Sequence, residues 1–123
     1  MHAFIIEDDY LISQAIQDML GRIGFTSFSF ARSEDAAIAG AAEQAFDLIT
    51  VDARLMPGDG IKAVETICAG GQVPVIFISG YAADVRQRVP GAVVVEKPIE
   101  EPLLQAAVGA VMGRQDPPGA PSP

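Results

Sequence analysis

Polar and ionisable side chains stand directly after several short apolar runs of this chain. In sequence order they are Glu7, Asp8, Asp52, Ser79 and Lys97. Carboxylates gathered in one place repel each other, and either a raised pKa on one of them or a bound hard cation relieves that repulsion. We favour the cation, because an all-oxygen site with open positions for water suits Mg²⁺. Lys97 and Ser79 could then bind the free oxygens of a phosphoryl group.

These residue types support transfer of a phosphoryl group to a carboxylate. That reaction depends mainly on positioning and on neutralising charge over the phosphoryl oxygens, which a magnesium ion, a lysine and a hydroxyl provide without a general base. Asp52 is then the nucleophile, and an acyl phosphate is its product. The added negative charge would draw Ser79 and Lys97 towards Asp52, which is a physical basis for a switch.

These side chains can meet if the apolar runs before them are parallel strands, because the carboxyl ends of such strands share one edge of a sheet. The sequence predicts five strands, at His2–Ile6, Thr26–Phe30, Leu48–Val51, Val75–Ile78 and Ala92–Val95. Most are nearly continuous apolar runs, as in strands that helices cover on both faces. Longer stretches of helical period separate them. The pattern predicts an α/β fold with a doubly wound, five-stranded parallel sheet.

Capping residues and helix breakers mark where the helices begin and end. Asp9 is expected to cap a first helix that ends at Gly24, and Ser33 is expected to cap a second helix. The fourth helix has only residues 82–89 before a Pro-Gly pair, so we expect it to be short or frayed. The fifth is expected at about Glu101–Met112. Residues 1–112 then form one domain, and residues 113–123 form a Pro-rich tail that we expect to be disordered.

The composition excludes several classes of partner. Sixteen acidic and 8 basic residues give a net charge of −8, which disfavours binding to nucleic acid or to anionic membranes. No apolar run resembles a signal peptide, so we expect a cytoplasmic protein. The lone Cys68 is expected in the core on the third helix, and the lone His2 lies at the wrong end of its strand to reach the acidic residues. Lys62, Arg86 and Arg88 are expected to be ordinary solvated charges.

Four segments, in the right order at the right strand ends, make the chain resemble the receiver domains of bacterial two-component response regulators. They are Ile6-Glu7-Asp8-Asp9, Val51-Asp52-Ala53-Arg54-Leu55-Met56-Pro57-Gly58-Asp59-Gly60, Phe77-Ile78-Ser79-Gly80 and Glu96-Lys97-Pro98. The resemblance covers residues 2 to about 112. It implies a flavodoxin-like sheet with the strand order 2-1-3-4-5. It also implies a signalling domain and not an enzyme.

The resemblance assigns a role to each site residue. Asp52 matches the phosphoryl acceptor, and Ser79 and Lys97 match the hydroxyl and the lysine that hold the phosphoryl oxygens. Asp8, Asp52 and the backbone carbonyl of Arg54 match the Mg²⁺ ligands, with Glu7 acting through water. The implied phosphoryl donor is a histidine kinase or a histidine phosphotransfer protein, and the output is contact with a downstream protein that the sequence does not identify. The Lys97-Pro98 bond is expected to be cis.

Two features depart from the usual receiver pattern. The aromatic residue that the family usually has three residues before the lysine is replaced by Val94, and the stretch from Ser79 to Lys97 is several residues shorter. In these respects the chain resembles a subgroup of mostly stand-alone receivers with a Phe-Ala-Thr-Gly-Tyr motif, here Phe77-Ile78-Ser79-Gly80-Tyr81. We predict that Tyr81 replaces the missing aromatic side chain.

Two other functions remain open at this point. A Mg²⁺-dependent phosphatase with an aspartyl nucleophile would use similar groups, but such enzymes usually carry Asp-x-Asp after the first strand, where this chain has Glu7-Asp8-Asp9. A degenerate receiver that acts as a binding module without phosphorylation is the other alternative. The full set of site residues argues against it.

Overall fold

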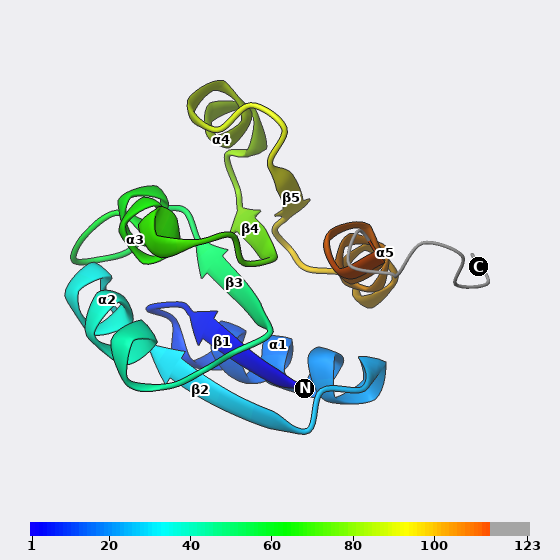
Figure 1. The fold of residues 1–123 in the computed structure, drawn as a ribbon. Coiled ribbons are helices and arrows are strands. Elements are labelled where there is room, and N and C mark those ends of the chain that lie inside the picture. Colours follow the sequence, from blue (N-terminus) through cyan, green and yellow to red (C-terminus); the bar gives the residue numbers. More distant parts are fainter. Residues whose placement is uncertain (114–123) are drawn as a thin grey trace.

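The computed structural model describes residues 1–113 and contains one parallel sheet of five strands (Figure 1). The strands are β1 (His2–Ile6), β2 (Ser27–Ala31), β3 (Leu48–Asp52), β4 (Val75–Ser79) and β5 (Val93–Glu96). Their order in the sheet is β2-β1-β3-β4-β5, which confirms the predicted fold class and topology. The second strand lies one residue later than predicted, because Ala31 still pairs with Ile6 at the end of β1.

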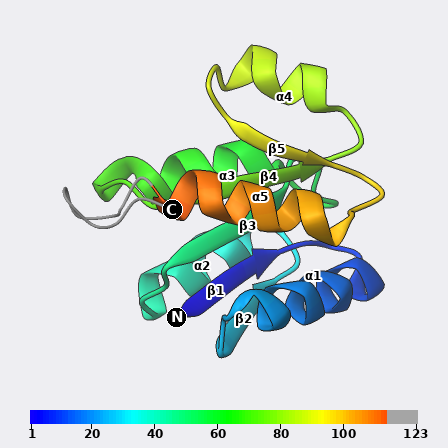
Figure 2. The same ribbon diagram turned by 90° about the vertical axis from the view of Figure 1, so that its right-hand side faces the viewer.

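One α-helix follows each strand, and the five helices cover both faces of the sheet (Figure 2). They are α1 (Tyr10–Ile23), α2 (Glu34–Glu43), α3 (Gly60–Ile67), α4 (Ala82–Arg88) and α5 (Glu101–Met112). Cys68 does not belong to α3 as predicted, because it begins a short 3₁₀ turn at Cys68–Gly70. It still packs against the core, and burial raises the pKa of its thiol.

Alternate residues of the strands point to opposite faces of the sheet and pack into two separate cores. In β1, Ala3 and Ile5 point into a core formed with α1 and α5, whereas Phe4 and Ile6 point into a core formed with α2, α3 and α4. Strands β1 and β3 are buried almost along their whole length. Burial on both faces fixes the ends of these central strands, and with them the residues that follow.

Several predicted helix boundaries are confirmed. The Asp9 side chain accepts a hydrogen bond from the Ile12 N–H at 3.1 Å, and Ser33 accepts one from the Ala36 N–H at 3.2 Å. Gly24 ends α1 with a φ of 131°, a value that glycine adopts without strain. The bond between Lys97 and Pro98 is cis, as is the bond between Met56 and Pro57.

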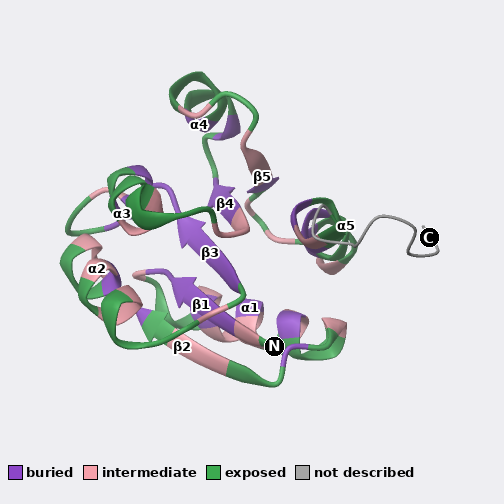
Figure 3. Cartoon of the chain, in the orientation of Figure 1, coloured by how far each residue is buried: buried purple, intermediate pink, exposed green. Residues whose placement is uncertain are grey.

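Helix α4 is the shortest of the five α-helices in the described chain. It has seven residues and no side-chain N-cap, and its buried residues are Ala82 and Val85. Figure 3 shows most of its surface as exposed. The prediction of a short fourth helix is confirmed.

The tail prediction for residues 113–123 falls, from residue 114 onward, outside the described residues. Within the described chain, no helix combines the length and the apolar character that crossing a bilayer requires.

Gly60 provides the first prediction, because α3 begins in close contact with the end of β3. A Cβ on Gly60 would lie 1.9 Å from the Asp52 carbonyl oxygen. Gly60→Ala is therefore expected to lower the free energy of unfolding by at least about 2 kcal/mol, as measured by urea denaturation. Gly109→Ala is the matched control, because nothing lies within 4 Å of its Cβ position on α5. It should be neutral or stabilise by about 0.5–1 kcal/mol. Equal effects of the two substitutions would contradict the close contact.

Candidate functional site

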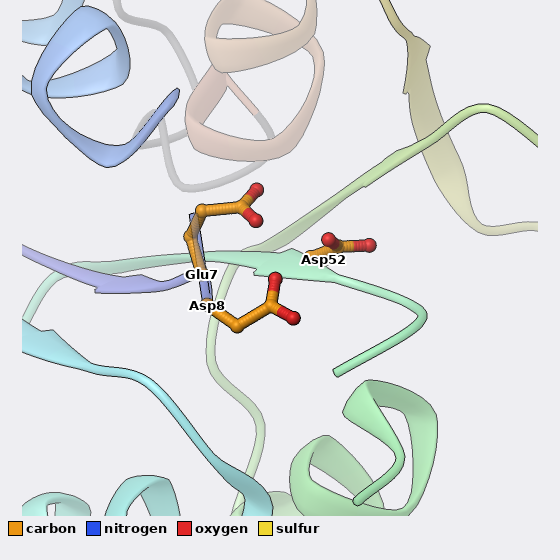
Figure 4. Close-up of side chains that lie close together, drawn as sticks. All are labelled: Glu7, Asp8 and Asp52. Atoms are coloured by element: carbon orange, nitrogen blue, oxygen red, sulfur yellow. The ribbon is translucent and has the colours of Figure 1, made fainter. Parts of the chain in front are cut away.

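Three carboxylates from two neighbouring strands converge at the carboxyl edge of the sheet (Figure 4). Glu7 and Asp8 directly follow β1, and Asp52 is the last residue of β3. The two strands pair in parallel with Ile6 opposite Val51, so the residues that follow them reach the same level. One oxygen from each carboxylate lies within 4.8 Å of the others. The parallel pairing thus brings together the three acidic side chains that the sequence singled out.

Glu7 is the most deeply buried of the three, with 2% of its surface exposed. Its Oε2 accepts a hydrogen bond from the Asp9 N–H at 3.2 Å, whereas Oε1 has no hydrogen-bond partner among the described residues. Burial, and then the charge of Asp52, raise the pKa of Glu7 to about 8. Without a bound cation, this carboxyl therefore holds a proton at neutral pH.

Lys97 is the cation of this pocket. Its Nζ lies 3.0 Å from Asp52 Oδ2 and 3.4 Å from Glu7 Oε1. Burial lowers the pKa of Lys97, but the hydrogen bond to Asp52 and the charges of Asp52 and Glu7 outweigh burial, so that the pKa is raised overall. Lys97 therefore remains charged and partly offsets the repulsion between the carboxylates.

Two backbone N–H groups of the segment after β3 hold the aspartates in place. Asp52 Oδ1 accepts a hydrogen bond from the Arg54 N–H at 3.0 Å, and Asp8 Oδ2 accepts one from the Met56 N–H at 3.1 Å. Asp52 itself is 7% exposed. Each aspartate is thus oriented by a fixed donor, and Asp52 also by Lys97.

Ser79 brings a hydroxyl to the same edge from the end of β4. Its Oγ is buried and accepts a hydrogen bond from the Tyr81 N–H at 2.9 Å. A hydroxyl that accepts one hydrogen bond keeps its own hydrogen as a donor. The backbone N–H of Lys97 donates to the Ser79 carbonyl at 3.0 Å, which keeps the lysine and the serine on adjacent strands at the same level.

The position of the Arg54 side chain could not be predicted from local sequence patterns. Its guanidinium carbon lies 3.5 Å from the centroid of the Tyr81 ring, and its Nη2 lies 3.5 Å from Asp84 Oδ2. Arg88 is exposed, as predicted for a solvated charge, and its Nη2 also forms an ion pair with Asp59 Oδ2 at 3.0 Å. Both contacts join residues about 30 positions apart. They depend on how α4 lies beside the segment after β3, which no local pattern encodes.

The donors of this pocket suit a hard divalent cation. They are carboxylate oxygens, and the buried Glu7 Oε1 has no hydrogen bond in the part of the chain that the structure describes. Burial, and then the charge of Asp52, raise the pKa of Glu7, and a cation bound here would favour its charged form. Glu7, Asp8 and Asp52 could therefore hold a cation such as Mg²⁺. His2 lies at the opposite end of β1, where its ring contacts Ser27 and Ser29, as its position predicted.

Comparison with known proteins gives one consistent family. Residues 3–109 match the model of the response regulator receiver domain. The receiver domain of PhyR from Erythrobacter litoralis is 29% identical, with a TM-score of 0.85, over 97% of this chain and 95% of that one. PhyR from Brucella abortus is 26% identical, with a TM-score of 0.85, over 93% of this chain and 48% of that one.

A curated relative matches over a shorter stretch. It is a protein-glutamate methylesterase/protein-glutamine glutaminase from Haloarcula marismortui, 27% identical over 81 residues, which are 66% of this chain and 22% of the relative. The chain thus spans about a fifth of that relative's length and about half of the Brucella PhyR.

The raised pKa of Glu7 predicts how stability depends on pH in the absence of divalent cations. The folded protein holds a proton that the unfolded chain releases above pH 4.5, the ordinary pKa of a glutamate carboxyl. This contribution to stability is complete below that pH and is lost as the pH rises through about 8. In EDTA, the unfolding free energy of the wild type is expected to fall across this range by up to about 1.4 kcal/mol per pH unit from this group.

Glu7→Gln should remove that slope and should be the more stable form above pH 8. Denaturant titrations at several pH values measure the difference. Glu96→Gln is the matched control, because Glu96 is an exposed carboxyl at the end of β5, next to Lys97. It should retain the slope of the wild type. Parallel slopes for the wild type and Glu7→Gln would contradict a neutral buried Glu7.

Proposed function

The chain belongs to the response regulator receiver domain family, and from this premise we propose that Asp52 accepts a phosphoryl group in a Mg²⁺-dependent phosphorelay. The observation that carries the proposal is the contact of Lys97 Nζ with Asp52 Oδ2 at 3.0 Å inside a pocket of three carboxylates. A cation fixed on the acceptor neutralises charge where an incoming phosphoryl group would place its oxygens.

The proposed donor is the phosphohistidine of a histidine kinase or of a histidine phosphotransfer protein. A carboxylate oxygen of Asp52 attacks the phosphorus atom, and the new P–O bond forms as the P–N bond to the donor imidazole breaks. The imidazole nitrogen takes a proton from water and leaves as neutral histidine. The product is an acyl phosphate on Asp52 with two negative charges in place of one, so atoms and charge balance.

Glu7, Asp8, Asp52 and the backbone carbonyl of Arg54 are the groups that would hold the Mg²⁺ ion, Glu7 through a water molecule. When bound, the ion supplies positive charge that neutralises the phosphoryl oxygens. Glu7 supports this part of the proposal, because its buried Oε1 has no hydrogen bond among residues 1–113 and its pKa is raised to about 8. Binding of a cation there would release the proton of Glu7.

Lys97 and Ser79 hold the transferred group. In the unphosphorylated protein Lys97 pairs with Asp52, and the phosphoryl oxygens offer it a stronger anion at the same place. The Ser79 hydroxyl already accepts the Tyr81 N–H, so its own hydrogen is available to a phosphoryl oxygen. Ser79 is the last residue of β4 and Lys97 directly follows β5, so the chain leads from them into α4 and α5. Their movement towards Asp52 would change the surface that a downstream protein contacts.

The acceptor residue provides the most direct test. Incubation with acetyl phosphate and Mg²⁺ should add the mass of one phosphoryl group to the wild type and none to Asp52→Asn, as measured by intact-protein mass spectrometry. Asp9→Asn is the matched control, because it removes a neighbouring carboxylate while asparagine keeps the cap of α1. It should be phosphorylated like the wild type. Rapid turnover of phosphomonoesters without a stable adduct would instead support the phosphatase alternative.

Binding of Mg²⁺ can be tested separately from phosphorylation. A free Mg²⁺ concentration of about 100 times the Kd should raise the unfolding free energy of the wild type by about 2.7 kcal/mol. Asp8→Asn should lose most of this gain, because Asp8 is one of the three clustered carboxylates. Asp9→Asn, with its carboxyl outside the cluster, should keep it. Denaturation with Mg²⁺ and with EDTA measures both, and an equal gain in the two variants would remove Asp8 from the metal site.

A further inference from the structure

Two ion pairs of opposite polarity join α4 to the segment between β3 and α3. Near the start of α4, Asp84 Oδ2 lies 3.5 Å from Arg54 Nη2. At its last residue, Arg88 Nη2 lies 3.0 Å from Asp59 Oδ2. Arg54 and Asp59 both belong to the segment that follows Asp52. The position of α4 is therefore coupled electrostatically to the loop that follows the proposed acceptor.

Other attachments of α4 are small. The helix buries Ala82 and Val85 and has no side-chain N-cap. A cavity of about 240 Å³ lies between α4 and the segment after β3, and Arg54, Ser79 and Asp84 are among the residues that line it. Ion pairs thus bridge the two ends of a gap that apolar side chains do not fill.

The two ion pairs are not held equally firmly. Arg54 and Asp84 have side chains that are 59% and 65% exposed, and such pairs contribute little to stability. Asp59 is fixed instead, because its Oδ1 accepts the N–H groups of Ile61 and Lys62 and its own N–H donates to Glu34. The pair at the end of α4 is shorter and its aspartate is already in position. The pair near the start of α4 is the weaker of the two.

Arg54 is linked both to the proposed acceptor and to Asp84. Its backbone N–H donates to Asp52 Oδ1 at 3.0 Å, and its side chain shares one open cavity with Ser79. The guanidinium rests on the Tyr81 ring, which leaves its N–H edge free to pair with an anion. Turning from Asp84 towards Ser79 requires no passage through the buried cores.

We propose that Arg54 is a shared cation that pairs with Asp84 in the unphosphorylated protein and with the phosphoryl group once Asp52 carries one. A phosphoryl group has close to two negative charges and three acceptor oxygens, and a guanidinium binds it through two parallel hydrogen bonds. The phosphoryl group therefore binds the Arg54 guanidinium in preference to the exposed Asp84 carboxylate. The first turn of α4 is released, while the Arg88–Asp59 pair keeps its last turn attached, and α4 turns about its C-terminal end. This inference rests on the proposed function.

Amide hydrogen exchange across α4 tests the idea in two steps. The first compares unphosphorylated variants in EDTA and needs no phosphoryl group. Asp84→Asn should speed exchange of the Val85 N–H, which donates to the Tyr81 carbonyl and closes the first turn of α4, by about two- to fivefold, the range that an exposed ion pair supports. Exchange of the Val89 N–H, which closes the last turn, should stay unchanged. Asp84→Glu should restore the exchange of the wild type. Arg86→Gln is the matched control, because Arg86 is an exposed residue of α4 outside both ion pairs.

The second step adds Mg²⁺ and beryllium fluoride, which mimics a phosphoryl group on a carboxylate. Wild-type exchange should rise in the first turn to the level of Asp84→Asn, and the variant should show no further rise. Fluorine NMR reports separately whether the mimic binds. Absence of a bound signal would contradict the proposed function, whereas a bound mimic without faster exchange in the first turn would overturn the transfer of Arg54. Unchanged exchange in unphosphorylated Asp84→Asn would refute the ion-pair attachment, whatever the mimic does.

Discussion

Repulsion between three carboxylates is the constraint on which the rest of this structure depends. Glu7, Asp8 and Asp52 lie within 4.8 Å of one another at the edge of a buried sheet, where water screens their charges poorly. Lys97 offsets part of the repulsion, and the raised pKa of Glu7 shows that part of it remains. The folded chain therefore keeps a local deficit of positive charge. A divalent cation would relieve that deficit. Added negative charge on Asp52 would attract every nearby cationic group more strongly.

Keeping the carboxylates together requires rigid supports, and the fold provides them through the central strands. Side chains on both faces of β1 and β3 are packed into separate cores, so neither strand can slide to move its last residue away from the other. Helix α3 begins directly against the Asp52 carbonyl, where Gly60 leaves no room for a side chain. Donors from Arg54 and Met56 then fix the aspartates. The energy that opposes the repulsion thus comes from apolar packing remote from the charges.

The parts of the site that the sequence predicted are those that chain direction alone determines. In a parallel sheet every strand delivers its following residue to the same edge, so Glu7, Asp8, Asp52, Ser79 and Lys97 could be grouped from their positions after apolar runs. Caps at Asp9 and Ser33 are local and were equally predictable. The contacts of Arg54 and Arg88 were not, because they depend on the placement of α4, which packing of two buried side chains and long-range charges decide. Surface charges carry no periodic signal, so the ion pair of Arg88 with Asp59 was not predicted.

The stacking of Arg54 on Tyr81 bears on the missing aromatic side chain at position 94. Val94 occupies the position where the family usually has an aromatic side chain, and it packs, half-buried, against the core beside Phe77. Tyr81 is 52% exposed, and its ring lies against the guanidinium of Arg54. A movement of Arg54 towards Asp52 would therefore take away the main described contact of the ring. If Tyr81 replaces the missing aromatic side chain, its movement and the release of α4 share one cause. Both follow from transfer of the Arg54 guanidinium from Asp84 to the phosphoryl group.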